Sequence, residues 1–179
     1  MMSPLAVIDR YYPHFDELRR LLLHHSWQVA DRALRCAAAH RELPIDRHLL
    51  LRGALLHDLG VFQTRAPSIH CHGTEHYLMH GFIGARLLRE LGCEAEARIC
   101  ERHTGTGLTA QTILERGLSV EPRDYLPEPL EEQLVCYADK FYSKSRPDQV
   151  LTFEQVCTGL QRYGERGVEK FREWHAMFG

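Results

Sequence analysis

The chain has 179 residues, 44% of them hydrophobic and 26% charged, and its formal net charge at pH 7 is −2. This composition is that of an ordinary globular protein, which excludes a disordered or fibrous one, and the length fits one domain. Because the charges balance and no Lys/Arg run is longer than a pair, neither a nucleic-acid polymer nor a membrane surface is expected as a partner.

The beginning of the chain has no basic segment followed by a long apolar stretch, so we expect no signal peptide or membrane anchor and assign the protein to the cytoplasm. The chain has 6 cysteines, none of them in a C-x-x-C pair. Free thiols are therefore favoured over disulfides or a zinc knuckle. Histidine is enriched, with 12 in the chain, and imidazole is the commonest transition-metal ligand.

Apolar residues recur at spacings of three and four along most of the chain, and alternating β-branched stretches are nearly absent. This pattern predicts an all-α fold, a single-domain helical bundle over residues 1–179, with a core at about 24–145 and C-terminal helices at about 152–178. The helices are expected at about 14–40, 46–59, 77–91, 93–103, 109–116, 130–143 and, as one or two helices, 152–178.

Three residues mark expected helix ends. Pro13 suits the first turn of the first helix, Asp46 is the expected N-cap of the second, and Gly60 is expected to end that second helix in a left-handed conformation. The second helix is apolar nearly all round, so it should lie in the core. The segment 61–75, rich in Thr, Pro, Gly and His, is expected to be a functional lid loop.

The most unusual local feature is the pair His57-Asp58 at the end of the most apolar predicted helix. Burying an unpaired polar group costs about 2 to 7 kcal/mol, and an isolated carboxylate costs more, so a bound cation would explain both residues. The alternative is a helix end with an exposed histidine and an aspartate that caps the next turn. The pair alone does not separate these two interpretations.

Two more polar residues lie on apolar helix faces. His25 shares a face with Leu21 and Val29, whereas His24 lines up with polar residues, so only His25 should point inward. Asp139 lies at the edge of the apolar stripe of a later helix. The alternatives are a hydrogen-bonded core histidine and an ion-paired aspartate.

The last two candidates are histidines at predicted helix ends. His80 stands near the start of one helix, and His103 closes another just before Gly105. A histidine at a helix C-terminus interacts favourably with the helix dipole without any metal, which is the alternative for His103. Only the whole set of candidates favours a metal site.

The set resembles the HD superfamily of metal-dependent phosphohydrolases, whose ligands occur in the chain order His25, His57-Asp58, His80, His103, Asp139. The segments around these residues are similar as well. They are His25-Ser26 with Val29-Ala30, Leu55-Leu56-His57-Asp58-Leu59-Gly60, His80-Gly81 with Gly84-Ala85, Glu101-Arg102-His103-Thr104-Gly105, and Tyr137-Ala138-Asp139-Lys140. The resemblance spans about 24–145 and is closest to uncharacterised HDIG-type bacterial and archaeal proteins.

The resemblance implies two metal ions, one held by His25, His57, Asp58 and Asp139 and the other by His80 and His103, with Asp58 bridging both. Iron or manganese is favoured and zinc, cobalt or nickel are alternatives, because four imidazoles and two carboxylates suit transition metals better than Mg²⁺ or Ca²⁺. Two such ions would activate water for hydrolysis of a small phosphoester or a nucleotide.

Basic side chains and free backbone N–H groups near the motifs are candidates for binding that substrate. The predicted substrate-binding residues are Arg65, Arg102, Gly105, Thr106 and Gly107. The predicted catalytic residues, beside Asp58, are Lys140 and His76. The loop residues His70, His72 and Glu75 could assist as acid, base or substrate contact. Simple surface solvation is the alternative for each of them.

Some features of better-known branches are absent. Val61-Phe62 occupies the stretch where many phosphodiesterases of the superfamily have a lysine, and there is no Gly-Tyr-Pro motif of the cyclic di-GMP branch. The acid that mononuclear nucleotidases carry soon after Asp58 is missing too, so no substrate is inherited. Two alternatives are kept: a di-iron oxygenase of the superfamily that cleaves a C–C or C–P bond, and a non-catalytic metal-stabilised binding domain. The expected partner is a small molecule, and a homodimer is left open.

Overall fold

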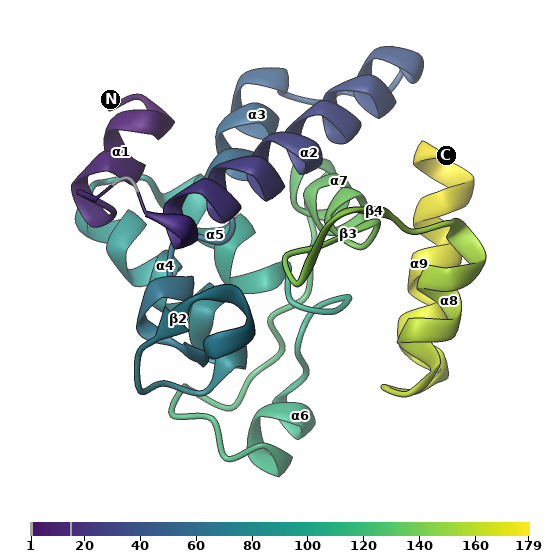
Figure 1. Cartoon of the computed structure of the whole chain (residues 1–179). Coiled ribbons are helices and arrows are strands. Elements are labelled where there is room, and N and C mark those ends of the chain that lie inside the picture. Colours follow the sequence, from purple (N-terminus) through teal and green to yellow (C-terminus); the bar gives the residue numbers. More distant parts are fainter. Residues whose placement is uncertain (1, 15) are drawn as a thin grey trace.

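The computed structural model describes residues 2–14 and 16–179, and helices form most of this part of the chain (Figure 1). They are α1 (Pro4–Tyr11), α2 (Glu17–Ala39), α3 (Arg47–Leu56), α4 (His80–Glu90), α5 (Glu94–Arg102), α6 (Ala110–Glu115), α7 (Leu130–Asp139), α8 (Phe153–Gln161) and α9 (Glu165–Phe178). The all-α prediction is confirmed. None of the described helices is long and apolar enough to cross a membrane.

Short elements make up the segment expected to be a loop. It contains the 3-10 helices η1 (Val61–Gln63) and η2 (Pro67–Ile69) and the strands β1 (Arg65–Ala66) and β2 (Cys71–His72), which pair antiparallel. A further 3-10 helix, η3 (Tyr77–Met79), leads into α4. A second antiparallel pair, β3 (Tyr142–Ser143) and β4 (Arg146–Val150), lies between α7 and α8.

The first predicted helix has different bounds in the structure. Residue 15 lies outside the described residues, α2 begins at Glu17, and Asp16 caps it by accepting the N–H of Arg19 (2.9 Å). Pro13 therefore precedes the helix, and α1 is an additional, separate helix. Asp46 is confirmed as the N-cap of α3, because its carboxylate accepts the N–H groups of His48 and Leu49 (2.9 and 3.0 Å). Such a cap contributes about 1 kcal/mol.

Helix α7 ends at Asp139, four residues before the predicted end at 143. Beyond it the backbone becomes extended, because Tyr142 and Ser143 pair with β4 and the carbonyl of Phe141 accepts the N–H of Leu151 (2.8 Å). The turn between β3 and β4 bends back toward the helices, which matters for the site below.

The prediction for Gly60 is wrong. Its φ is −85°, which any residue adopts, so a left-handed helix end does not explain this glycine. A Cβ at Gly60 would lie 2.2 Å from the carbonyl oxygen of His80 and 2.5 Å from the amide nitrogen of Gly84. The glycine allows the backbone after α3 to approach α4 closely, and this approach brings Asp58 near His80.

Two hydrophobic cores meet where the cluster of candidate ligands lies. The larger one packs α2, α3 and α7 against the hairpin of α8 and α9, with Tyr137 stacked on Phe171 (ring centroids 5.3 Å apart). The other packs α1 and α4 against the ends of α2, α3 and α5. His25 lies between Leu22 of the second core and Val29 of the first. Each fully buried large apolar side chain contributes about 1.5 to 3 kcal/mol.

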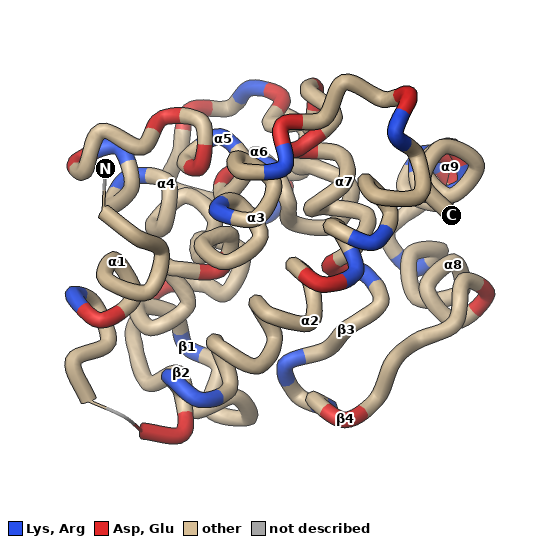
Figure 2. The backbone as a smooth tube through the Cα atoms, turned by 90° about the horizontal axis from the view of Figure 1, so that it is seen from above, with Lys and Arg blue, Asp and Glu red and all other residues tan. Residues whose placement is uncertain are grey.

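Charged residues of both signs are interspersed along the described chain, as Figure 2 shows. This distribution agrees with the formal net charge of −2. All six cysteines are free, as expected, and all but Cys36 are buried.

Candidate metal centre

Six polar side chains that are distant in sequence meet in the interior, at helices or directly after them. They are His25 in α2, His57 and Asp58 after α3, His80 at the start of α4, His103 after α5 and Asp139 at the end of α7. Two groups share Asp58, and within each group the possible ligand atoms lie within 4.8 Å of one another. One group is His25, His57, Asp58 and Asp139, and the other is Asp58, His80 and His103.

The two carboxylate oxygens of Asp58 face different imidazoles. Oδ2 lies 3.2 Å from Nε2 of His25 and 3.0 Å from Nε2 of His57. Oδ1 lies 3.4 Å from Nε2 of His80 and 3.5 Å from Nε2 of His103. Oδ1 of Asp139 completes the first side, 3.0 Å from Nε2 of His25. Asp58 thus stands between two sets of donors, the arrangement of a bridging carboxylate.

Backbone carbonyls orient three of the imidazoles. Nδ1–H of His57 donates to Ala54 (2.7 Å), that of His103 donates to Cys100 (2.7 Å), and that of His80 donates to the carbonyl of Tyr77 (2.6 Å). The last carbonyls of a helix have no partner within it, so α3 and α5 offer these acceptors at their ends. In the neutral form of each imidazole, with the proton on Nδ1, Nε2 has a lone pair directed into the cluster, as a metal ligand requires.

The cluster has unmet hydrogen-bonding demand that a cation would satisfy. Both oxygens of Asp58 are fully buried, and within the described residues no donor is aligned with either of them as a hydrogen bond. The ammonium of Lys144 lies 2.6 Å from Oδ2 as an ion pair. A buried carboxylate costs several kcal/mol unless it is paired or coordinated. Four imidazoles and two carboxylates are the donor set of a first-row transition metal, so the residues present fit such ions.

His57 and His80, one from each group, have pKa values shifted in opposite directions. Burial lowers the pKa of His57, but the carboxylates of Asp58 and Asp139 outweigh it and raise the pKa to about 9. Burial and the neighbouring His103 lower the pKa of His80 to about 3. The side with two carboxylates therefore attracts positive charge more strongly than the side that shares only one.

The carboxylates are held in their ionised form. Burial alone would raise the pKa of Asp58, but His57 and Lys144 bring it well below its usual range. The pKa of Asp139 is likewise lowered against the effect of burial, chiefly by Lys140, whose ammonium lies 2.5 Å from Oδ2. Both aspartates are thus available as anionic ligands.

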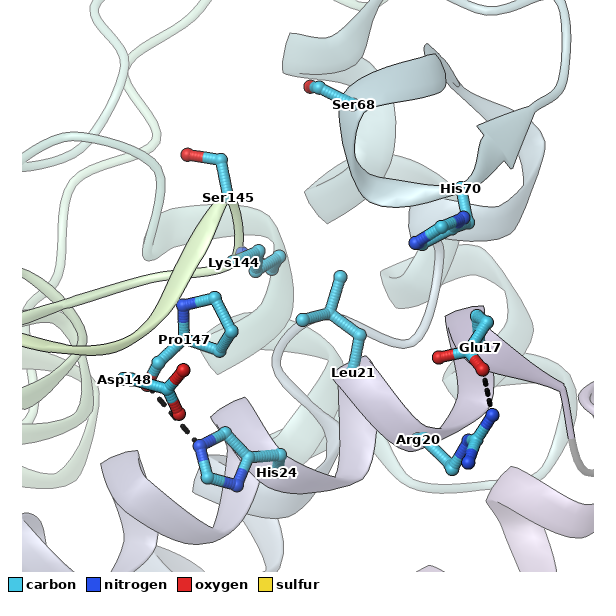
Figure 3. Close-up of a pocket in the computed structure, with 10 residues that line it drawn as sticks. All are labelled: Glu17, Arg20, Leu21, His24, Ser68, His70, Lys144, Ser145, Pro147 and Asp148. Carbon is cyan, nitrogen blue, oxygen red and sulfur yellow. Dashed lines mark hydrogen bonds and ion pairs between the residues drawn. The ribbon is translucent and has the colours of Figure 1, made fainter.

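A cavity of about 400 Å³ opens beside the cluster (Figure 3). It lies between the beginning of α2, the loop at η2 and the β3–β4 turn, and Lys144 lines it. The lining residues are Glu17, Arg20, Leu21, His24, Ser68, His70, Lys144, Ser145, Pro147 and Asp148. A smaller cavity of about 300 Å³ shares Ser68, Lys144 and Ser145 with it and adds Tyr77. Lys144 therefore connects the candidate centre to both cavities.

The predicted substrate-binding residue Arg102 is engaged elsewhere. It is buried and donates to the carbonyl of Leu126 (2.9 Å) and to Glu128 (2.7 Å). Arg98 donates to the buried Glu132 of α7 (2.8 Å), so this network ties α5 to α7. This network ends directly before His103 in the chain, and Arg102 lines neither cavity.

The other predicted contacts also lie away from the two cavities. Gly105, Thr106 and Gly107 form a turn in which the N–H of Gly107 donates to the carbonyl of Thr104 (3.0 Å). Gly107 has a φ of +95°, and a Cβ there would lie 2.8 Å from the carbonyl oxygen of Tyr125. The turn packs against the segment before α7. Its substrate role, like that of Arg102, stays a prediction.

Two predicted loop residues have local partners. Arg65 is exposed in β1, opposite His72 of β2. His76 caps η3, where its Nδ1 accepts the N–H of Leu78 (3.2 Å). Lys140 lies at the cluster, because its ammonium also reaches the carbonyl of His103 (3.3 Å).

Lys144 is the residue that the sequence analysis missed. The predicted helix ran to 143, just before this lysine, whereas in the structure the chain turns after β3 and directs the lysine inward. The signal available in the sequence was a lysine with Ser, Arg and Pro neighbours soon after Asp139, a composition typical of a turn.

The fold and the cluster define a class: a helical-bundle protein with a buried His/Asp cluster that could hold metal ions. The chain belongs to the HD domain family, which it matches over residues 22–143. The family predicted from the motifs is confirmed. Helices α8 and α9 follow the matched region.

Three relatives are similar to much of this chain. An uncharacterised protein of Methanocaldococcus jannaschii is 40% identical over 121 residues, which cover 66% of this chain and 64% of that protein. A tRNA (cytidine(56)-2'-O)-methyltransferase of Picrophilus torridus is 36% identical over 76% of this chain and 35% of its own length. The enzyme of the same name from Thermoplasma volcanium is 29% identical over 86% of this chain and 40% of its own length. The chain thus spans less than two thirds of the length of each relative.

Solved structures share the fold. The HD domain of the L. monocytogenes phosphodiesterase PgpH superimposes with a TM-score of 0.55 at 18% identity, covering 97% of this chain and 95% of that one. The same domain in complex with cyclic-di-AMP gives a TM-score of 0.52 at 18% identity. This superposition covers 96% of our chain and 92% of the PgpH domain.

Proposed function

We propose that this chain is a metal-dependent phosphohydrolase that hydrolyses a small phosphoester at a two-metal centre. The observation that carries the proposal is the fully buried Asp58, with one oxygen facing His25 and His57 and the other facing His80 and His103. A single carboxylate between two sets of imidazoles is suited to bridging two cations.

In this proposal, His25, His57, Asp58 and Asp139 hold one ion, and Asp58, His80 and His103 hold the second. When bound, two adjacent cations lower the pKa of a water molecule and withdraw charge from a phosphoryl group. Iron or manganese is favoured, and the donor set also accommodates zinc, cobalt or nickel.

The chain's own residues prepare the site in two ways. The carbonyls at positions 54, 77 and 100 hold three imidazoles with Nε2 toward the cluster. Lys140 donates to Oδ2 of Asp139 and leaves Oδ1 directed at His25, so we assign it the positioning of that carboxylate. For His76, the role of acid or base is supported only by its loop and stays a prediction.

Similarity to known proteins supports the class of reaction. The PgpH domain is a phosphodiesterase domain solved with cyclic-di-AMP, a small phosphoester, and the fold is shared over nearly the whole chain. Its identity to this chain is 18%, so the substrate is not transferred. The two relatives named as tRNA methyltransferases are much longer proteins, and this chain covers only 35% and 40% of their length.

The test is metal analysis of protein purified without added metal, followed by turnover on a panel of phosphomonoesters and phosphodiesters. We expect up to two transition-metal ions per chain and release of inorganic phosphate or of an alcohol, with Asp58→Ala lacking both metal and turnover. Added tRNA is a competitor in the panel, because of the two methyltransferase names, and we expect no inhibition. Metal-loaded protein that is inert on the whole panel would refute the hydrolase and favour a binding domain.

The oxygenase alternative shares the same six ligands and is tested separately. We expect the turnover to proceed unchanged under strict anaerobiosis, because hydrolysis needs water and no O₂. Oxygen consumption in proportion to product, with iron required, would replace the hydrolase by a di-iron oxygenase.

A further inference from the structure

Asp139 has the most exposed side chain of the six cluster residues. His57 and Asp58 are 0% exposed, and the other three histidines are at most 3% exposed. The side chains of Asp139, Lys140 and Lys144 are 11%, 13% and 11% exposed. The least buried edge of the cluster is therefore the one at Asp139, where both lysines lie, and it is called the entrance below.

The two lysines at this entrance face different surroundings. The ammonium of Lys140 is engaged by Asp139 and by the carbonyl of His103 and lines neither cavity. The ammonium of Lys144 lies 2.6 Å from Oδ2 of Asp58, and its side chain lines both cavities. Lys144 is thus the cation that can contact the cluster and a ligand in the cavity together.

The position of Lys144 is fixed by the hairpin that carries it. The carbonyl of Pro147 accepts hydrogen bonds from Nε2 of His24 (3.3 Å) and from the side-chain amide of Gln28 (3.0 Å), both in α2. These bonds anchor the β3–β4 turn on the helix that also carries His25. Lys144 and the ligand residue His25 therefore share one rigid support.

The opposite wall of the cavity is formed by Ser68 and His70. Figure 3 shows His70 and Lys144 approaching the cavity from opposite sides, with Leu21 between them. His70 has a φ of +60°, the only positive value at a non-glycine residue within the described ranges. Such a conformation costs of order 1 to 3 kcal/mol and is found more often at binding sites than elsewhere. Ser68 and His70 also have no side-chain partner among the described residues, which leaves their polar atoms to a ligand.

The lining of the larger cavity indicates the kind of molecule that fits. Its apolar members are Leu21 and Pro147, and it contains no Phe, Tyr or Trp. A nucleobase gains about 1 to 3 kcal/mol from stacking on an aromatic ring, and this wall offers none. In the smaller cavity the ring of Tyr77 already lies against His80 (centroids 4.8 Å apart). Hydroxyl, imidazole and carboxylate groups at the rim suit a hydroxylated ligand instead.

We propose that Lys144 binds the phosphate of the substrate and that the cavity it shares with Ser68 and His70 receives a small, hydroxylated, non-aromatic alcohol. The substrate class is that of sugar or polyol phosphates. This inference rests on the proposed function, because it places the scissile phosphate at the Asp58 side of Lys144. An ammonium at hydrogen-bond distance from the bridging carboxylate is also within reach of a phosphate bound there.

The first experiment measures binding of inorganic phosphate to metal-loaded protein by calorimetry, with Lys144→Met, Lys144→Arg and the control Lys170→Met. Lys170 is the one lysine away from the entrance, paired with Glu173 at the surface. We expect Lys144→Met to weaken phosphate binding about 10- to 100-fold at unchanged metal content, because one charge-assisted hydrogen bond is lost. Lys144→Arg should recover part of the affinity, and Lys170→Met should bind as the unaltered protein does.

Two results would overturn the assignment of Lys144. One is unchanged phosphate affinity in Lys144→Met, and the other is loss of metal from that variant, since Lys144 would then serve the metal centre. Phosphate binding needs no turnover. An unaltered protein that binds phosphate through Lys144 but hydrolyses no ester therefore refutes the proposed hydrolase and leaves the phosphate site standing.

The second experiment compares kcat/KM for a hexose phosphate, glycerol phosphate and a purine nucleoside monophosphate. We expect the first two to be preferred at least about tenfold. The double variant Ser68→Ala/His70→Ala should reduce this preference by raising KM for the hexose and glycerol phosphates, at unchanged metal content. Preference for the nucleotide, or a preference that the double variant does not alter, would sink the assignment of the cavity.

Discussion

The metal cluster and the cavity beside it are built from different parts of the chain. The cluster takes its residues from helices and helix ends, buries them, and orients three imidazoles with backbone carbonyls. The cavity is formed by the η2 loop, the β3–β4 turn and one face of α2, and most of its lining is exposed.

In the proposed function, this difference separates two roles: the cluster binds metal and the cavity recognises the substrate. Rigid, buried helix ends fix the distances that a metal centre needs. Loops at the entrance are free to change their side chains without disturbing the bundle, so they are suited to determine which substrate is bound. Changes in the cluster should therefore alter metal content and stability, and changes in the cavity should alter recognition alone.

The largest effect is expected from Asp58→Asn, which keeps the shape of the side chain but removes the charge that both groups share. We expect loss of metal from both groups and a fall in kcat of at least about 1000-fold, because a two-metal mechanism loses both of its cations. Metal content by mass spectrometry and steady-state kinetics measure the two effects. Asp148→Asn, an exposed carboxylate at the cavity rim, is the control and should keep its metal.

Retention of a full complement of metal by Asp58→Asn would contradict the bridging role. Retention of one ion would show that one group binds metal independently, which would divide the cluster into a strong and a weak half.

A pH effect is expected for protein stripped of metal. The pKa of His80 is lowered to about 3 in the folded state, whereas an unfolded histidine titrates near 6.5. Between these values the unfolded chain binds one more proton, so acidification from pH 6.5 toward 3 destabilises the fold by about 1.4 kcal/mol per pH unit for this group. The pKa of His57 is raised, so its contribution is lost above pH 6.5 and adds no slope below it.

The measurement is urea unfolding from pH 6.5 to 4.5 for the unaltered chain and for His80→Gln. The variant should show a shallower fall in the free energy of unfolding with decreasing pH. Equal slopes for both proteins would mean that His80 is not held neutral in the folded state.

Gly60 tests the close approach that brings Asp58 beside His80. Gly60→Ala should lower the free energy of unfolding by about 1 to 3 kcal/mol or more, because the new Cβ would overlap backbone atoms that cannot move aside cheaply. Gly159→Ala is the matched control, since a Cβ in α8 meets nothing within 4 Å and should be neutral or slightly stabilising. Equal stability changes in the two variants would remove the explanation given for Gly60.

The cluster could be predicted because its residues break a strong pattern. His25 and the pair His57-Asp58 are polar residues in apolar helical surroundings, and helical periodicity says which way they point. Gly60 could not be predicted in the same way, since a glycine signals either a left-handed conformation or a close contact and the sequence does not tell which. The structure shows the contact.

The cavity could not be predicted, because the sequence of the segments that line it has no helical or strand periodicity. Ser68 and His70 lie in a segment of short elements, and their positions follow from tertiary contacts rather than from local pattern. The inward position of Lys144 could not be predicted, because α7 ends four residues before the predicted helix end. There the pairing of β3 with β4 overrides the helical pattern of the sequence. Arg102 was predicted to bind substrate because it is a basic residue beside a motif. In the structure its guanidinium instead donates to Leu126 and Glu128, in the network that joins α5 to α7.

The smallest effect is expected from His24→Ala, which removes one of the two hydrogen bonds that anchor the β3–β4 turn through Pro147. Gln28 keeps the other bond, so the turn should loosen without leaving the helix, and KM should rise about two- to fivefold. Metal content and kcat should not change, because the cluster lies on the buried side of α2. The double variant with Gln28→Ala should raise KM further and increase hydrogen exchange at residues 142–150. Loss of metal from either variant would mean that the entrance and the cluster are not separable, and the division between rigid centre and adaptable cavity would fail.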